Sequence, residues 1–104
     1  MEKVNKIIQI LQDLKVKDLV AYDFEKTSPF YDYFVIATVN ERQGGAAVNH
    51  LKKALVEGEI RHVEGKGGSW VLIDMHDVIV HLFKDEDRKY YNFDQRLLGV
   101  KRIT

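Results

Sequence analysis

The chain has 104 residues, 45% of them hydrophobic and 31% charged, and its sixteen basic side chains balance sixteen acidic ones. This length supports one compact domain, so we expect residues 1–104 to form a single domain with its own core. Zero net charge argues against a protein that holds nucleic acid mainly through phosphates. The absence of cysteine excludes disulfides, thiolate catalysis and cysteine-type zinc sites.

The N-terminal sequence has acidic residues among its basic ones and no small-residue cleavage site, unlike a signal or transit peptide. No apolar run approaches the length that spans a bilayer. We therefore expect a cytoplasmic protein that does not enter a membrane.

The first half of the chain predicts a helix, two strands and a second helix. These elements are expected at residues 1–14, 18–24, 31–39 and 40–57. The second strand is apolar at both alternating sets of positions, so it should lie centrally. Asn40 and Gln43 have the spacing of a capping box, and Gly58 is a natural helix stop.

The second half of the chain predicts three strands and one short helix. They are expected at residues 60–64, 70–74, 78–83 and 85–93, with Asp85 as the N-cap of the helix. The order αββαβββα has no regular βαβ repetition, which favours an α+β fold or a layered α/β fold, with a mixed sheet of four or five strands. The two main helices each have one apolar stripe and should pack mainly on one face of that sheet.

Patterns that could support catalysis are weak. The glycine-rich segment Gly65–Ser69 precedes a strand and contains no Gly-Lys pair followed directly by Ser or Thr, as a phosphate-binding loop would, so a connecting loop is favoured. Asp85 and Asp87 lie at a helix start, where acidic side chains are expected anyway. The four histidines are not spaced as zinc ligands. We therefore expect no catalytic residue, no metal site and no cofactor.

The predicted hairpin at 70–83 is apolar on both faces. If Asp74 lies opposite Asp77, one face of the hairpin carries Trp70, Leu72, Ile79 and His81. The two predicted amphipathic helices and the one short helix are too few to cover both faces of the sheet, so apolar surface should remain for a partner. Trp70 is then an interface anchor or a core residue, and the pattern leaves both open.

Three segments resemble the ribosomal silencing factor family, also called Iojap-like. They read YDYFVIAT, then EG followed by WVLIDMHDVIVHLF, then R-x-YYNFD, within residues 18–98. The most specific part of the resemblance is the run Trp70, Asp74, Asp77 and His81. The chain departs from the family pattern at the hairpin turn, where His76 replaces a glycine.

The resemblance implies an α+β fold related to nucleotidyltransferases, in a protein that is not an enzyme. It implies binding to the large ribosomal subunit through its fourteenth ribosomal protein, which blocks joining of the small subunit and represses translation when nutrients are scarce. It implies no sequence-specific contact with nucleic acid and leaves a homodimer open. The alternative is a small nucleotidyltransferase-like enzyme or a nucleotide-binding protein, which would need the paired carboxylates that the sequence lacks.

The expected partner-binding residues follow from the hairpin and the resemblance together. Trp70 should be the anchor, and Asp77 should pair with a basic residue of the partner. The full expected set is Trp70, Leu72, Asp77, Ile79 and His81, joined by Tyr33 from the neighbouring strand and Arg88 from the last helix.

Overall fold

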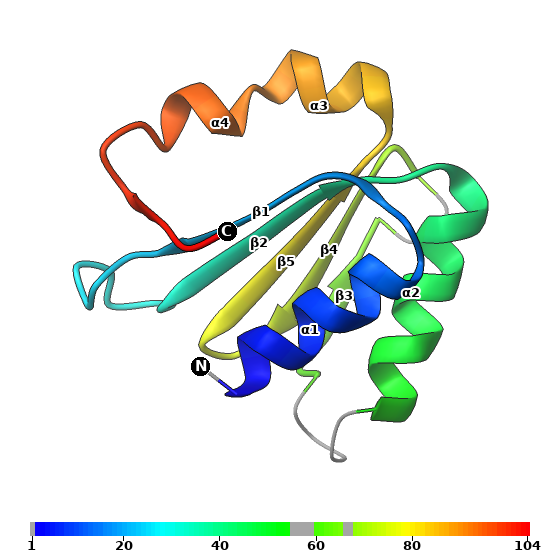
Figure 1. The fold of residues 1–104 in the computed structure, drawn as a ribbon, viewed down its shortest axis with the longest axis horizontal. Helices are drawn as coiled ribbons and strands as arrows, with labels where there is room; N and C mark the ends of the chain where they lie inside the picture. The colour runs from blue at the N-terminus through cyan, green and yellow to red at the C-terminus, as the bar shows by residue number, and fades with distance from the viewer. Residues whose placement is uncertain (1, 55–59, 66–67) are drawn as a thin grey trace.

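The computed structural model of this chain describes residues 2–54, 60–65 and 68–104. A six-stranded mixed sheet forms the centre, and helices lie on both of its sides (Figure 1). In chain order the elements are α1 (Glu2–Asp13), β1 (Lys17–Asp23), β2 (Tyr33–Thr38), α2 (Glu41–Ala54), β3 (His62–Glu64), β4 (Trp70–Met75), β5 (Val78–Phe83), α3 (Asp85–Tyr91), α4 (Phe93–Arg96) and β6 (Lys101–Arg102).

The α+β class and the mixed sheet are confirmed, with six strands in place of four or five. The strand order is β3-β4-β5-β2-β1-β6. Among the strands that the structure describes, the central pair β2 and β5 is parallel and the other pairs are antiparallel. Both central strands are mainly apolar on both faces, and both faces are covered over them except at Ile79 beside the turn. A nucleotidyltransferase-like topology stays a prediction.

The register of the β4–β5 hairpin differs from the predicted one. Asp74 pairs with Ile79, which leaves only His76 and Asp77 in the turn, so the predicted pairing of Asp74 with Asp77 was wrong by two residues. A slip of two residues keeps every side chain on its predicted face, because side chains alternate with a period of two. His76 adopts a φ of 70°, which two-residue hairpin loops commonly require and which glycine adopts without strain.

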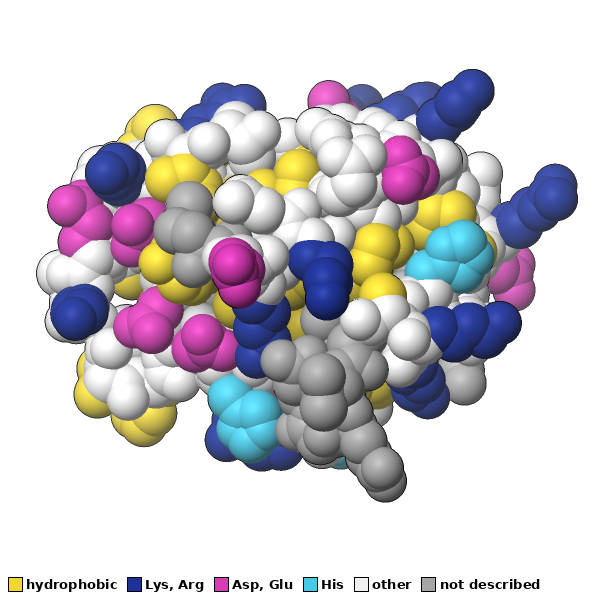
Figure 2. All heavy atoms as spheres, turned by 60° about the horizontal axis from the view of Figure 1, so that its bottom comes forward, with side chains coloured by type: hydrophobic (Ala, Val, Ile, Leu, Met, Phe, Trp, Pro, Cys, Tyr) yellow, Lys and Arg dark blue, Asp and Glu magenta, His cyan; other side chains and the backbone are white. Residues whose placement is uncertain are grey.

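One face of the sheet is covered by α1 and α2, as predicted (Figure 1). The core under these helices contains Val4, Ile7, Leu11, Ala47, Val48, Leu51, Val71, Ile73, Met75, Val78, Val80 and Leu82, among others. On the outer side of the helices, hydrophobic side chains lie in small separate areas among charged and polar ones (Figure 2). The described residues on this side therefore form no broad apolar surface for a partner (Figure 2).

The predicted cap of α2 is confirmed, and the predicted cap of α3 was wrong. The Gln43 amide donates to Asn40 Oδ1 at 2.8 Å, and the Asn40 amide donates to Gln43 Oε1 at 3.0 Å. The N-cap of α3 is Lys84, not Asp85, and it has no side-chain capping bond. Asn92, with a φ of 48°, ends α3 and divides the predicted helix 85–93 in two. The expected helix stop at Gly58 lies outside the described residues.

The opposite face of the sheet is covered by a C-terminal segment instead of a long helix. We call residues 85–104, which contain α3, α4 and β6, the C-terminal arm; it crosses this face and ends beside β1 (Figure 1). The cluster beneath the arm contains Val20, Tyr22, Ile36 and Phe83, with Phe34, Trp70, Tyr91, Phe93, Leu97 and Val100 packed around them.

Leu11 provides the test of this packing, because its side chain is fully buried between α1 and the sheet. Leu11→Ala should lower the free energy of unfolding by about 2–5 kcal/mol, the usual cost of a buried leucine side chain. The exposed neighbour offers a matched control: Gln12→Ala should change stability by less than about 0.5 kcal/mol. Urea unfolding followed by circular dichroism measures both. Equal stability of Leu11→Ala and the parent protein would place α1 outside the core.

Candidate functional site

The face of the β4–β5 hairpin under and beside the C-terminal arm is the candidate site, and we call it the Trp70 face. It carries Trp70, Leu72, Asp74, Ile79, His81 and Phe83, which pair across the two strands. The arm packs over the end of this face that holds Trp70 and Phe83. Leu72 and Ile79, nearer the turn, are partly exposed and lie outside the packed clusters. The face is therefore half core and half open surface.

Trp70 is held by four aromatic rings and one hydrogen bond. Its ring centroid lies 4.7 Å from that of Tyr91, 5.1 Å from that of Phe83, 5.6 Å from that of Phe93 and 5.9 Å from that of His81. Its indole Nε1–H donates to Nδ1 of His81 at 3.2 Å. Trp70 is still only partly buried. The two sequence interpretations of Trp70 therefore meet in one side chain, which is packed against the arm and only partly buried.

His81 is 3% exposed and supports Trp70 from below. Because its Nδ1 accepts the indole hydrogen, neutral His81 carries its own proton on Nε2. That Nε2 is buried and has no hydrogen-bond partner among the residues that the structure describes. Phe34 and Phe93 lie edge-on to the ring, at centroid distances of 4.6 and 5.0 Å. Burial lowers the pKa of His81 to about 4, so the side chain is neutral at pH 7.

Asp77 lies in the turn at the open end of the Trp70 face. Lys3 Nζ of α1 lies 3.0 Å from Asp77 Oδ1 and donates to the Met75 carbonyl at 2.7 Å. The Asp77 side chain is nevertheless 49% exposed, so its carboxylate can accept further hydrogen bonds. The Asp77 carbonyl accepts from the amides of Asp32, at 2.7 Å, and Tyr33, at 3.0 Å, which fixes the turn against the start of β2.

Asp74 is the second acid of this face, and it is paired. Arg61 donates to Asp74 Oδ2 at 2.8 and 3.2 Å. The His76 amide donates to Asp74 Oδ1 at 3.0 Å, which stabilises the turn. Burial acts to raise the pKa of Asp74, but the hydrogen bonds from Arg61 and His76 outweigh it and hold the pKa below its usual range.

Two expected site residues do not lie on the Trp70 face. Tyr33 pairs with Val78 and packs against the core under α1 and α2, so its predicted placement beside Trp70 was wrong. Arg88 is 8% exposed and is used within the protein. Its Nε and Nη2 donate to the Asp94 carboxylate at 3.0 Å each, and its Nη1 donates to the Thr38 hydroxyl at 3.3 Å.

The Arg88 contacts make a latch that fastens the arm to the sheet. Arg88 belongs to α3 and Asp94 to α4, while Thr38 ends β2. The hydrogen bonds from Arg88 hold the pKa of Asp94 below its usual range. Burial, and then the nearby Asp94 carboxylate, raise the pKa of Tyr22. The sequence did not indicate this latch, because an arginine in a charged helix reads as surface.

These features define a class of protein: a small α+β domain with a partly open aromatic sheet face, suited to binding another macromolecule. Among the described residues, no group of three or more His, Cys, Asp or Glu side chains is placed to hold a metal ion. In the same part of the chain, no helix is long and apolar enough to cross a membrane.

Comparisons with known proteins agree on one family. The family model described as "Ribosomal silencing factor during starvation" matches residues 1–97. Ribosomal silencing factor RsfS of Halalkalibacterium halodurans is 37% identical over 92 residues, which is 85% of this chain and 79% of that protein. The RsfS of Chromobacterium violaceum is 31% identical over 106 residues, covering 97% of this chain and 87% of the relative. The chain therefore belongs to the ribosomal silencing factor family.

Solved structures match equally well. A crystal structure of a Chromobacterium violaceum protein has a TM-score of 0.81 and 32% sequence identity, and the match covers 99% of this chain and 88% of that one.

The chloroplastic protein Iojap of Arabidopsis thaliana is 28% identical over 91 residues, which is 85% of this chain but 38% of that longer protein. These relatives are named as silencing factors or as Iojap, and no catalytic activity is indicated by the names.

Burial of His81 predicts a stability change with pH. Its folded pKa of about 4 lies below the usual 6.5, so the unfolded chain takes up the proton first as pH falls. The contribution of neutral His81 to the free energy of unfolding is therefore fully present above pH 6.5, and it is lost as the pH falls toward 4. Between pH 7 and 4.5 the loss should be about 2–3 kcal/mol, at about 1.36 kcal/mol per pKa unit.

The measurement is urea unfolding across this pH range for the parent protein and for His81→Gln, whose amide cannot titrate. His81→Gln should remove most of the dependence, whereas His50→Gln, at an exposed position on α2, should leave it unchanged. A parent protein with no greater pH dependence than His81→Gln would show that His81 titrates normally.

Proposed function

We propose that this protein binds the large ribosomal subunit in the cytoplasm, through that subunit's fourteenth ribosomal protein, and so blocks joining of the small subunit. It represses translation in this way when nutrients are scarce, and residues 1–104 act as one silencing-factor domain. The observation that carries the proposal is the family match over residues 1–97. The half-open Trp70 face supports it, since an apolar area with one large aromatic is typical of protein interfaces.

The residues on and beside the Trp70 face contribute to docking in different ways. Leu72 and Ile79 contribute exposed apolar area, and Trp70 presents the free part of a ring that stacking already holds rigid. A rigid anchor loses little entropy on binding. His81 does not touch the partner but orients Trp70 through its hydrogen bond. Arg88 also contributes indirectly, because its hydrogen bonds fix the position of the arm that packs on Trp70.

Charge at the turn end of the face favours a basic partner surface. Asp77 keeps half of its side chain exposed although Lys3 is bound to it. Glu64, on the edge strand β3, pairs with Leu72 and is exposed. A basic side chain of the partner that reaches Asp77 gains a charge-assisted hydrogen bond, which fixes orientation more than it adds affinity.

A homodimer through the same apolar area would compete with ribosome binding, because one surface cannot serve both partners. Light scattering over a concentration series tests this. A protein that stays at monomer mass up to hundreds of micromolar forms no such dimer, and the ribosomal proposal does not depend on it.

Ile79→Lys is the sharpest test of the docking face. Ile79 is partly exposed and outside the packed clusters, so lysine there should leave the fold intact. It should weaken binding to purified large subunits by about 30-fold or more, since an interface hot spot is worth about 2 kcal/mol or more. Trp70→Ala is a weaker test of the docking face, because this substitution also removes core packing under the arm.

Leu98→Lys is the matched control, because Leu98 is 78% exposed on the arm and away from the Trp70 face. Co-sedimentation with large subunits measures both variants, and circular dichroism checks their folding. If folded Ile79→Lys binds as tightly as Leu98→Lys and the parent protein, docking uses another surface.

A further inference from the structure

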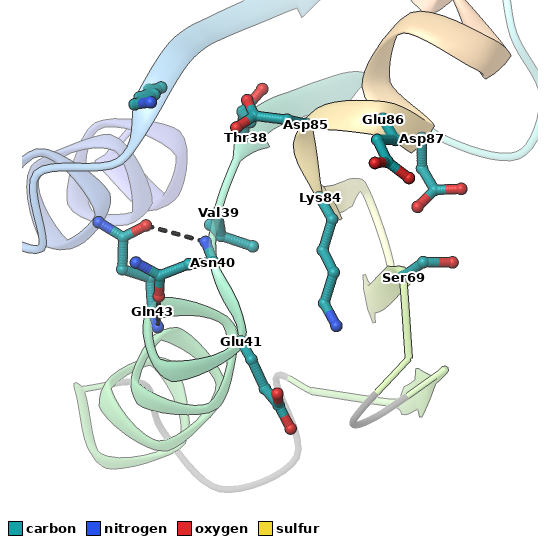
Figure 3. A pocket seen from close by; sticks show the side chains of 11 residues that line it. Thr38, Val39, Asn40, Glu41, Gln43, Ser69, Lys84, Asp85, Glu86 and Asp87 are labelled. Atoms are coloured by element: carbon teal, nitrogen blue, oxygen red, sulfur yellow. Dashed lines mark hydrogen bonds between the residues drawn. The ribbon is translucent and has the colours of Figure 1, made fainter.

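A second candidate site lies where the two central parallel strands end. There a cavity of about 570 Å³ opens between the end of β2, the start of α2 and the start of α3 (Figure 3). The chain leaves β2 into α2 on one side of the sheet and leaves β5 into α3 on the other. Where neighbouring parallel strands diverge in this way, open sheets form a crevice in which ligands bind. None of the docking residues proposed above lines this cavity.

The cavity continues into an apolar recess of about 230 Å³. The two share Val39, Asn40, Glu41 and Lys84. The floor of the recess is made by Val48, Val71 and Leu82, which belong to the main core. Gly45 lines it too, and a Cβ atom added there would meet nothing within 4 Å. A glycine inside a helix costs about 1 kcal/mol relative to alanine, and the open space beside Gly45 leaves room for a larger side chain.

The mouth of the cavity carries charges of both signs. Its charged side chains are Lys17, Glu41, Lys84, Asp85, Glu86 and Asp87. Within the described part of the chain none of the six forms an ion pair. Lys84 extends into the space between Glu41 and Ser69 (Figure 3). Four carboxylates against two ammonium groups leave an excess of two negative charges, which favours a cationic group at the mouth.

We propose that this joined cavity binds a small organic ammonium ion with an apolar body, either an aliphatic amino acid or the corresponding amine. The apolar body fills the recess over Val48, Val71 and Leu82. The ammonium group lies at the mouth beside Glu41, across Lys84 from the acids that begin α3 (Figure 3). The carboxylate of an amino acid then faces Lys84, whereas a simple amine makes no use of that lysine.

Three probes of one shape separate the possibilities: L-leucine, isoamylamine and N-acetyl-L-leucine. Titration calorimetry should show saturable binding of L-leucine or isoamylamine with a dissociation constant of about 1 mM or tighter, as expected for ligands of this size. N-acetyl-L-leucine lacks the ammonium group and should bind at least about tenfold more weakly, the worth of about 1.4 kcal/mol. Tighter binding of L-leucine than of isoamylamine, lost in Lys84→Gln, identifies an amino acid. Equal binding identifies an amine.

Two variants with matched controls tie the signal to this cavity. Gly45→Leu should fill the recess and abolish binding while keeping or raising the melting temperature, because it replaces a helical glycine where there is open space. Glu41→Gln should weaken binding about tenfold, whereas Glu2→Gln, in the first turn of α1, should not change it. The proposal is overturned if L-leucine and isoamylamine both fail to bind, if N-acetyl-L-leucine binds as tightly as they do, or if Gly45→Leu leaves binding unchanged.

Discussion

The parallel pairing of β2 with β5 determines which surfaces the other elements of the fold have to cover. It places two strands that are apolar on both faces in the middle of the sheet, so both faces must be shielded from water. Helices α1 and α2 shield one face with long apolar stripes. No third long helix exists among the described residues, and the other face is shielded by short helices that place Tyr91 and Phe93 over Trp70 and Phe83. The C-terminal arm does not extend as far as the β4–β5 turn, so the side chains of Leu72 and Ile79 stay partly exposed.

The arm that supplies this cover depends on a buried charge. Arg88 is almost fully enclosed, and an enclosed guanidinium is tolerated only when its donors are satisfied. Asp94 accepts two of its hydrogen bonds and Thr38 a third, so one side chain joins α3, α4 and the end of β2. Such a bond set contributes specificity of position more than net stability. It holds the aromatic underside of the arm in register with Trp70, and the partly open face follows from that register.

Much of the fold follows from local patterns in the sequence. The two helical stripes, the capping box at Asn40 and five of the six strands were predicted because each has a period or a turn signal of its own. Strand β6 has no such signal: it is two charged residues held by pairing with β1 and by the Ile103 amide on the Ala21 carbonyl at 2.9 Å. The break at Asn92 was missed because a single left-handed residue leaves the surrounding helical pattern intact.

The site was harder to predict, for reasons of symmetry in the pattern. Strand 31–39 is apolar on both alternating sets of positions, so nothing in it shows which face Tyr33 joins; only pairing with β5 decides this. The hairpin is apolar on both sides of its turn, so a slip of two residues preserves the pattern. What fixes the register is tertiary: Met75 is fully buried, and Lys3 binds both its carbonyl and Asp77. Contacts between distant segments carry that information, and a local pattern cannot.

The Trp70 face, which we propose as the docking face, and the cavity at the strand ends are physically adjacent. Ser69 lines the cavity and is followed by Trp70, while Lys84 lines it and follows Phe83, the ring stacked on Trp70. The Lys84 amide donates to the Ser69 carbonyl at 3.0 Å, so the two walls are tied beside the aromatic cluster. A ligand that shifts this pair of residues shifts Trp70 with them. By thermodynamic linkage, any change it makes in the affinity for the partner is matched by an equal change that the partner makes in the affinity for the ligand.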